Sequence, residues 1–219
     1  MYDRVLIEFL SYINNFKDFD YILALIKSTV APTNNNLKLG TMMNLRNAKR
    51  PLKDYWMKNK FILKDALGLD FFELKEGEDS VLVYFFKDER LERKLSQVKI
   101  KDFLDSHGYE SCLTTGDYLN LLRERFTETC PDEIGIFLGY PLKDVIDFKH
   151  RDKKACKCTG YWKCFNNEKS SLEAFKRFDE VKVIEMKNIL QSLWYYENYL
   201  ININNKTLYH ISIQEDWAN

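Results

Sequence analysis

The chain has 219 residues, and its 33 lysine and arginine residues balance 33 aspartate and glutamate residues, so the formal net charge is zero. Hydrophobic residues make up 45% and charged residues 30% of the sequence, which is typical of a folded globular protein and excludes an intrinsically disordered chain. The zero net charge argues against a protein that neutralises many nucleic-acid phosphates over its whole surface.

The first ten residues lack the apolar run of a secretory signal, because Asp3, Arg4 and Glu8 interrupt it. The longest apolar run, residues 81–86, is far too short to span a bilayer. We therefore expect a cytoplasmic protein without a membrane partner, whose 5 cysteines are reduced thiols.

Hydrophobic periodicity predicts helices in the first third of the chain. Apolar residues recur at helical spacing over residues 5–13 and again over residues 22–29. Pro32 and the three asparagines at 34–36 predict the end of the second helix. A third is expected over residues 51–67, where Gly68 would end it.

The hydrophobic period then changes to that of β-strands. Residues 69–74 and 80–86, separated by the turn 76–79, predict a hairpin. The second of these segments is apolar on both faces, so we expect it to be a central strand. Further helices are expected over residues 87–94, 100–106 and 118–127.

Residues 130–148 predict two short helices joined by a tight turn. Pro131 and Pro141 suit first helical positions, Glu133 lies in a first turn where carboxylates are favoured, and Gly139 would end the first helix.

Three features are expected after this pair: a strand within residues 156–165, a long helix over 168–199, and a late strand over 207–213. Together the elements predict an α+β fold, in which helices pack a small, mainly antiparallel sheet and the chain has a long C-terminal helix. We expect one domain over residues 1–189 and a C-terminal extension, 190–219, packed on it.

Two motifs in the second half of the chain resemble a known family. Residues 131–145 (PDEIGIFLGYPLKDV) and 158–163 (CTGYWK) are similar to the signature of DUF3793, a clostridial family of unknown function. The similarity extends back through residues 31–33 and Lys38 and forward to about residue 183. Genes of this family often lie near flavodoxin and ferrous-iron genes, so the resemblance points to redox or iron physiology.

This chain departs from the family pattern at three positions. Members usually carry a His–Cys pair before Ala-Pro-Thr, where this sequence has Thr29 and Val30, and a histidine where it has Asp132. The chain therefore resembles a divergent member that lacks side chains suited to metal or acid–base chemistry, a pattern that favours binding over catalysis.

Our leading hypothesis is a non-catalytic protein that binds a small ligand or a partner protein. Tyrosine and tryptophan offer large apolar faces with a polar group, although such residues more often pack in a core. No complete catalytic set is present, so no catalytic residue and no cofactor is assigned. The candidate ligand-binding residues are Lys38, Glu133, Tyr140, Gly160, Tyr161, Trp162 and Lys163.

The alternative is a thiol- or metal-dependent protein in redox or iron handling. Cys156, Cys158 and Cys164 could bind a metal as thiolates, although their spacing differs from that of a common zinc knuckle. Neighbouring basic residues such as Lys154 and Lys157 would lower the pKa of a nearby thiol. Cysteines in such segments are more often small, partly buried apolar residues.

A third hypothesis is DNA binding, because the two short helices also resemble a helix-turn-helix. The second helix would present Asp144 and Asp147 to phosphates, which argues against a nucleic-acid partner. The basic run over residues 46–64 could attract an anion, but such runs are usually solvated helix faces. The oligomeric state does not follow from the sequence.

Overall fold

The computed structural model describes residues 2–126, 130–152 and 154–215, with side chains described up to residue 192. The chain forms an α+β fold, in which helices surround a small antiparallel sheet, as predicted. Its elements are α1 (Tyr2–Ile13), α2 (Asp18–Asn34), β1 (Gly40–Arg46), α3 (Leu52–Leu67), β2 (Asp70–Glu76), β3 (Ser80–Phe86), α4 (Asp88–Leu95), α5 (Val98–Leu104), the π-helical turn η1 (Asp105–Tyr109), α6 (Thr115–Arg125), α7 (Ile134–Phe137), α8 (Leu142–Phe148), β4 (Cys158–Thr159), β5 (Lys163–Cys164) and α9 (Glu168–Glu215).

The three-stranded sheet has the order β1-β3-β2, and both neighbours of β3 are antiparallel to it. This confirms the predicted hairpin and the central position of its second strand. Val83 and Phe85 pack with α2 and α3 on one face, whereas Tyr84 and Phe86 pack among α4 to α7 on the other. Because alternate side chains of β3 enter two separate cores, the strand is apolar on both faces.

One strand was missed and one predicted strand was wrong. Strand β1 was not predicted, since its sequence GTMMNLR has few β-branched residues. The late strand predicted over residues 207–213 is instead part of α9, which continues to Glu215. The predicted end of α3 is confirmed, because Gly68 caps it in a left-handed conformation with φ of 62°. Residue 127, the last of the predicted helix 118–127, lies outside the described residues.

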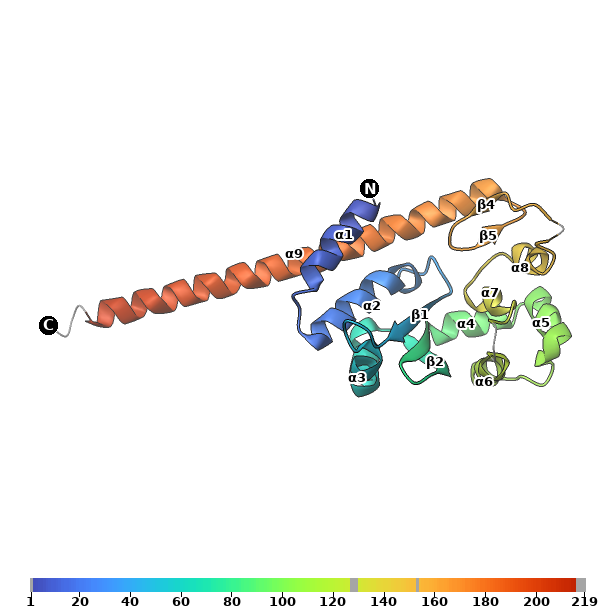
Figure 1. Cartoon of the computed structure of the whole chain (residues 1–219), viewed down its shortest axis with the longest axis horizontal. Helices are drawn as coiled ribbons and strands as arrows, with labels where there is room; N and C mark the ends of the chain where they lie inside the picture. Colours follow the sequence, from blue (N-terminus) through green and yellow to red (C-terminus); the bar gives the residue numbers. More distant parts are fainter. Residues whose placement is uncertain (1, 127–129, 153, 216–219) are drawn as a thin grey trace.

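Helix α9 runs along the length of the molecule (Figure 1). The hairpin β4–β5 lies beside its first turns, and α1 crosses it further along. Phe9 and Ile13 of α1 form a core with Ala24 of α2 and with Met186 and Ile189 of α9. The same helix therefore contacts both the N-terminal helices and the hairpin.

The boundary expected at residue 190 stays a prediction, because the side chains that would pack the extension lie outside the described residues. Among the helices described, none combines the length and apolar composition needed to cross a membrane.

Tyr84 connects the sheet to the helices that follow it. Its ring lies so close to Gly40 that a Cβ atom there would be 2.2 Å from the ring. Its hydroxyl donates a hydrogen bond of 2.6 Å to the carbonyl oxygen of Phe137. Because Phe137 ends α7, this contact fixes the helical pair against the sheet.

Candidate functional site

The helices α7 and α8 form the predicted tight pair, and two glycines permit it. Gly139 has a φ of 80°, which a residue with a side chain rarely adopts. A Cβ atom on Gly135 would lie 2.7 Å from the Cγ2 of Val145, so only glycine allows the helices to approach this closely. The pair therefore places Tyr140 at its turn, half-buried and facing the following segment.

The segment that was predicted as one strand is a hairpin of two short strands. Cys158 pairs with Cys164, and the turn between them carries Tyr161 and Trp162. A Cβ atom on Gly160 would lie 2.4 Å from the ring of Phe175, so the absence of a side chain lets the hairpin lie directly on α9. Gly160 thus acts through packing.

Asp144 holds this hairpin against α8. The Nε1 of Trp162 donates to its Oδ2 at 3.1 Å, and the backbone N–H of Phe165 donates to its Oδ1 at 3.0 Å. Asn166 adds two hydrogen bonds to Oδ1, from its backbone at 3.0 Å and from its side chain at 2.7 Å. Only 3% of the Asp144 surface is exposed. Sequence reasoning did not identify this role, because the acceptors and donors lie 18 to 22 residues apart.

A cavity of about 370 Å³ lies between the helical pair and the hairpin. Its volume is in the range of small-ligand sites. Three of the predicted ligand-binding residues, Tyr140, Trp162 and Lys163, meet at its wall. The rings of Tyr140 and Trp162 contact each other, with centroids 5.1 Å apart. The other lining residues are Cys130, Pro131, Asp132, Ile134, Gly135, Asp144, Val145, Phe148 and Arg151.

Two cations, Arg151 and Lys163, and two carboxylates, Asp132 and Asp144, line the cavity, and Asp144 is bound to the hairpin. The Arg151 guanidinium lies 4.6 Å from the centroid of the Phe148 ring, and the Lys163 ammonium lies 6.0 Å from the same centroid. The Oδ1 of Asp132 forms a long ion pair with the Nη1 of Arg151, at 4.0 Å. Burial and the carboxylates of Asp132 and Glu133 raise the pKa of the Cys130 thiol, which keeps it protonated.

Lys38 and Tyr161 lie next to this cavity but are not among its lining residues. The Lys38 ammonium is 5.9 Å from the ring centroids of both Tyr140 and Tyr161. Burial, together with the positive charge of Lys182, lowers the pKa of Lys38 to about 8. Burial and the carboxylate of Asp179 raise the pKa of Tyr161, whose hydroxyl donates to that carboxylate at 2.7 Å.

Glu133 lies away from the cavity, in a buried ion pair. Only 1% of its surface is exposed, and its Oε1 contacts the Nε of Arg125. The same oxygen accepts a hydrogen bond of 3.3 Å from the hydroxyl of Tyr109. Its carboxylate is therefore committed to connecting α6 and η1 with the start of α7.

The three cysteines of the hairpin lie close together. The Cys156 Sγ is 3.0 Å from the carbonyl oxygen of Cys158, and Cys158 lies opposite Cys164 in the register. Burial and the neighbouring Cys164 raise the pKa of Cys158 to about 11, whereas the basic residues nearby were expected to lower it. Lys154 and Lys157 instead contact Asn166. Within the described parts of the chain, no group of three or more His, Cys, Asp or Glu side chains could hold a metal ion.

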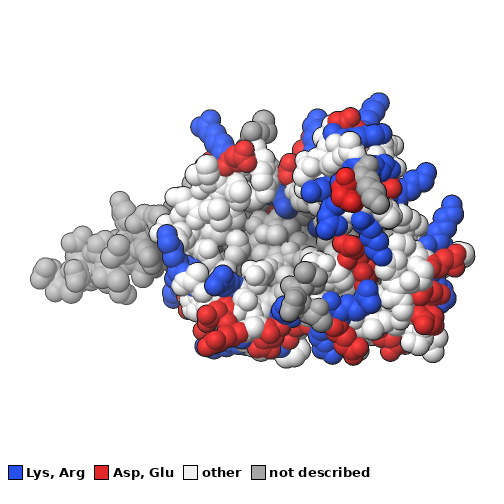
Figure 2. Space-filling view, turned by 45° about the vertical axis from the view of Figure 1, so that its right-hand side comes forward, with Lys and Arg blue, Asp and Glu red and all other residues white. Residues whose placement is uncertain are grey.

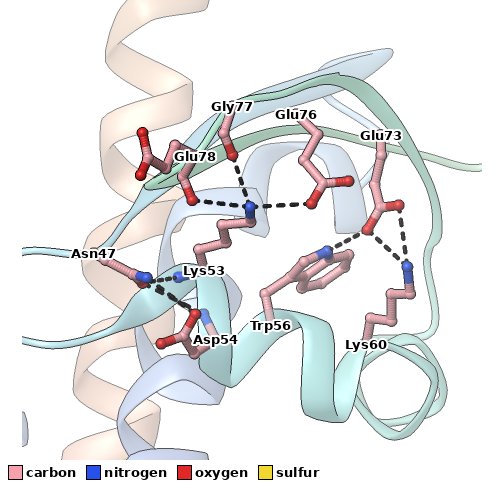
Figure 3. A network of polar contacts seen from close by, with 9 residues as sticks. All are labelled: Asn47, Lys53, Asp54, Trp56, Lys60, Glu73, Glu76, Gly77 and Glu78. Carbon is pink, nitrogen blue, oxygen red and sulfur yellow. Dashed lines mark hydrogen bonds and ion pairs between the residues drawn. The ribbon is translucent and has the colours of Figure 1, made fainter.

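Two lysines of the basic run over residues 46–64, Lys53 and Lys60, are paired within the protein (Figure 3). Lys60 contacts both carboxylate oxygens of Glu73, at 3.0 and 3.1 Å, and Glu73 also accepts from Trp56 Nε1 at 2.7 Å. Lys53 donates to the carbonyl oxygen of Gly77 at 2.7 Å and pairs with Glu76. These lysines fix α3 against β2 and its turn, so they do not form a free anion site.

The face of α8 that a helix-turn-helix would present to DNA is occupied by the segment that follows it. Asp144 binds the hairpin, and Asp147 contacts Lys154 and accepts from Asn166 at 2.7 Å. Figure 2 shows lysine and arginine side chains interspersed with aspartate and glutamate side chains on the charged part of the face that it presents. This arrangement does not favour a nucleic-acid interface.

Comparison with known proteins gives a family and no activity. A family model described as a protein of unknown function, DUF3793, matches residues 26–196. This range includes the cavity, the hairpin and the sheet. No curated protein and no solved structure matches the chain.

Proposed function

We propose that this chain, which belongs to the DUF3793 family, binds a small ligand that has a flat apolar body and a negatively charged group. The observation that carries the proposal is the cavity of about 370 Å³, with an aromatic wall at one side and two cations beside it. A volume of this size accommodates a small molecule, whereas a partner helix would need an extended groove.

The apolar part of the ligand would contact Tyr140 and Trp162. Asp144 fixes Trp162 by accepting its N–H, and Gly160 fixes the hairpin on α9. The wall is therefore held in place before a ligand binds, and a rigid wall reduces the entropy that binding costs. A flat ring system would gain most from stacking on these side chains.

The negative group of the ligand would lie near Arg151 and Lys163. Both cations lie over the Phe148 ring, and among the described residues Lys163 has no carboxylate within ion-pair distance. Asp132 neutralises Arg151 only weakly at 4.0 Å. The lining carboxylates equal the lining cations in number, but Asp144 is bound to the hairpin, so Lys163 is the cation that an anionic group of the ligand would pair with.

Titration with 8-anilinonaphthalene-1-sulfonate, an aromatic sulfonate, tests both parts of the proposal. The probe should fluoresce on binding, and thermal-shift screening of metabolites, flavins and haem would then look for natural ligands. Trp162→Ala should weaken probe binding at least tenfold, and Lys163→Ala should weaken it several-fold. Lys169→Ala is the matched control, because this exposed lysine of α9 does not line the cavity. Equal affinities for all four proteins would refute the site.

A second candidate function, thiol redox, is supported by the position of Cys158 opposite Cys164 in the hairpin. Residues paired across antiparallel strands have Cα separations that a disulfide can span. With a disulfide oxidant such as oxidised glutathione, each thiol would lose its hydrogen, the two sulfurs would bond, and the oxidant would be reduced to two thiols.

Peptide mass analysis after equilibration in glutathione buffers of graded potential tests this candidate. The hairpin peptide should lose two hydrogen atoms in an oxidising buffer and regain them in a reducing one. Cys158→Ser should abolish the change, whereas Cys112→Ser should leave it intact, since Cys112 is buried in another core. A hairpin that stays reduced at every potential would remove the candidate.

A further inference from the structure

Lys38 is a largely buried lysine whose backbone is fixed and whose ammonium group, among the described residues, faces aromatic rings. Its N–H donates to the carbonyl oxygen of Pro32 at 3.0 Å, and its own carbonyl accepts from Arg90 at 3.0 Å. Only 8% of its surface is exposed. Among the described residues, the contacts of its ammonium group are with two tyrosine rings and not with a carboxylate.

Aromatic rings and a second cation surround this amine. The Nζ lies over the rings of Tyr140 and Tyr161, 5.9 Å from each centroid. The ammonium group of Lys182 in α9 also lies over the Tyr161 ring, 4.7 Å from its centroid. The Asp179 carboxylate of α9 accepts a hydrogen bond from the Tyr161 hydroxyl.

This environment disfavours a permanent ammonium ion at Lys38. Burial removes hydration, the charge of Lys182 repels a second cation, and two ring contacts at 5.9 Å compensate only in part. The Tyr140 and Tyr161 ring faces also carry negative potential, so they would repel a bound anion or a carbamate at the same place. A neutral nitrogen group fits best.

We propose that Lys38 is a covalent attachment site for a small aldehyde, which it binds as an imine between the rings of Tyr140 and Tyr161. The imine nitrogen is neutral when unprotonated, which removes the repulsion from Lys182. When it is protonated, the iminium ion keeps the favourable contact with both ring faces. The proposal concerns a group outside the cavity lining and does not depend on the ligand proposed above.

The reaction balances without a redox partner. The Lys38 nitrogen lone pair attacks the aldehyde carbon, and the electron pair of the C=O π bond moves to oxygen. Transfer of a proton from nitrogen to that oxygen gives a hemiaminal. The hydroxyl group then leaves as water with a second proton from nitrogen, and a C=N bond forms.

The protonation state of Lys38 supports this chemistry. Its pKa is lowered to about 8 from the ordinary 10.5, first by burial and then by Lys182. At pH 7.5 roughly a quarter of such amines are neutral, against about one in a thousand of ordinary lysines. The neutral amine is the nucleophile, so Lys38 should react ahead of exposed lysines.

Limited reductive methylation tests the proposal. The full chain is treated with a limiting amount of formaldehyde and cyanoborohydride, which reduces each imine to a stable methylamine, and lysine modification is mapped by peptide mass analysis. Near neutral pH, Lys38 should be methylated at least tenfold faster than Lys99, an exposed lysine. The Lys38 rate should reach half its maximum near pH 8, while the Lys99 rate continues to rise.

Two variants complete the test. Lys38→Arg keeps a cation between the rings but cannot form an imine, and it should remove the fast-reacting site without changing the far-ultraviolet circular dichroism. Lys38→Met should do the same if arginine is too large. Methylation of Lys99 without methylation of Lys38, or equal pH profiles for both, would overturn the proposal, and neither result would affect probe binding in the cavity.

Discussion

Replacement of Asp144 should separate the hairpin from α8. Its carboxylate accepts from Trp162 Nε1 and from the backbone N–H groups of Phe165 and Asn166, so Asp144→Ala leaves these donors without an acceptor. Hydrogen bonds to a charged group contribute about 1.5–3 kcal/mol each. Part of this sum is regained because the carboxylate no longer has to be desolvated, so the net loss should be about 3–5 kcal/mol. For a chain of this length, that lowers the melting temperature by about 6–20 °C.

Asp144→Asn is the informative comparison. The amide oxygen can replace Oδ1, which accepts from Phe165 and Asn166, but the amide nitrogen would face the N–H of Trp162. We expect a loss of about 1–2 kcal/mol, together with a change in tryptophan emission. Urea unfolding followed by circular dichroism and by fluorescence measures both effects. A loss below about 1 kcal/mol for Asp144→Ala, or the same loss for both variants, would show that the carboxylate does not hold the hairpin.

Three further predictions concern packing and protonation. Gly160→Ala places a Cβ atom 2.4 Å from the Phe175 ring, so it should cost about 1–3 kcal/mol in thermal unfolding, and addition of Phe175→Leu should recover part of the loss. Tyr84→Phe removes the 2.6 Å hydrogen bond to Phe137 and leaves a buried carbonyl unpaired, so chemical unfolding should show a loss of about 1–3 kcal/mol. Lys38 binds its proton more weakly in the folded chain, so between about pH 8 and 10.5 the unfolded chain holds a proton that the folded chain has lost. The wild-type free energy of unfolding should therefore rise with pH relative to Lys38→Met, by at most about 1.4 kcal/mol per pH unit, and a falling or flat difference would contradict the lowered pKa.

The sequence predicted those elements whose ends and hydrophobic pattern depend on residues close together in the chain. Gly68 ends α3 in a left-handed conformation, and the apolar run 80–86 becomes the central strand because both its faces are covered. Strand β1 escaped prediction because its pairing with the distant strand β3, from Gly40 opposite Phe86 to Arg46 opposite Ser80, stabilises it more than its own composition does. Residues 207–213 alternate in hydrophobicity yet continue a helix that begins at Glu168.

The candidate site was predicted only where its residues lie in recognisable sequence motifs. Tyr140, Trp162 and Lys163 carry aromatic or charged groups in motifs that mark a site, and they meet at the cavity. Glu133 belongs to the same motif but pairs with Arg125, a contact that no sequence pattern indicates. The role of Asp144 depends on donors from a later segment, so it becomes visible only when the hairpin is placed on α8.

The length and position of α9 constrain how the chain reaches its native state. The core that joins Phe9 and Ile13 to Met186 and Ile189 brings together residues from opposite ends of the chain. During synthesis, the apolar face of α1 is completed before its partner exists, and it stays exposed until more than 150 further residues have been made. Contacts of such high sequence separation form late and expose apolar surface meanwhile. Helix α1 therefore needs protection from aggregation while the chain folds on the ribosome.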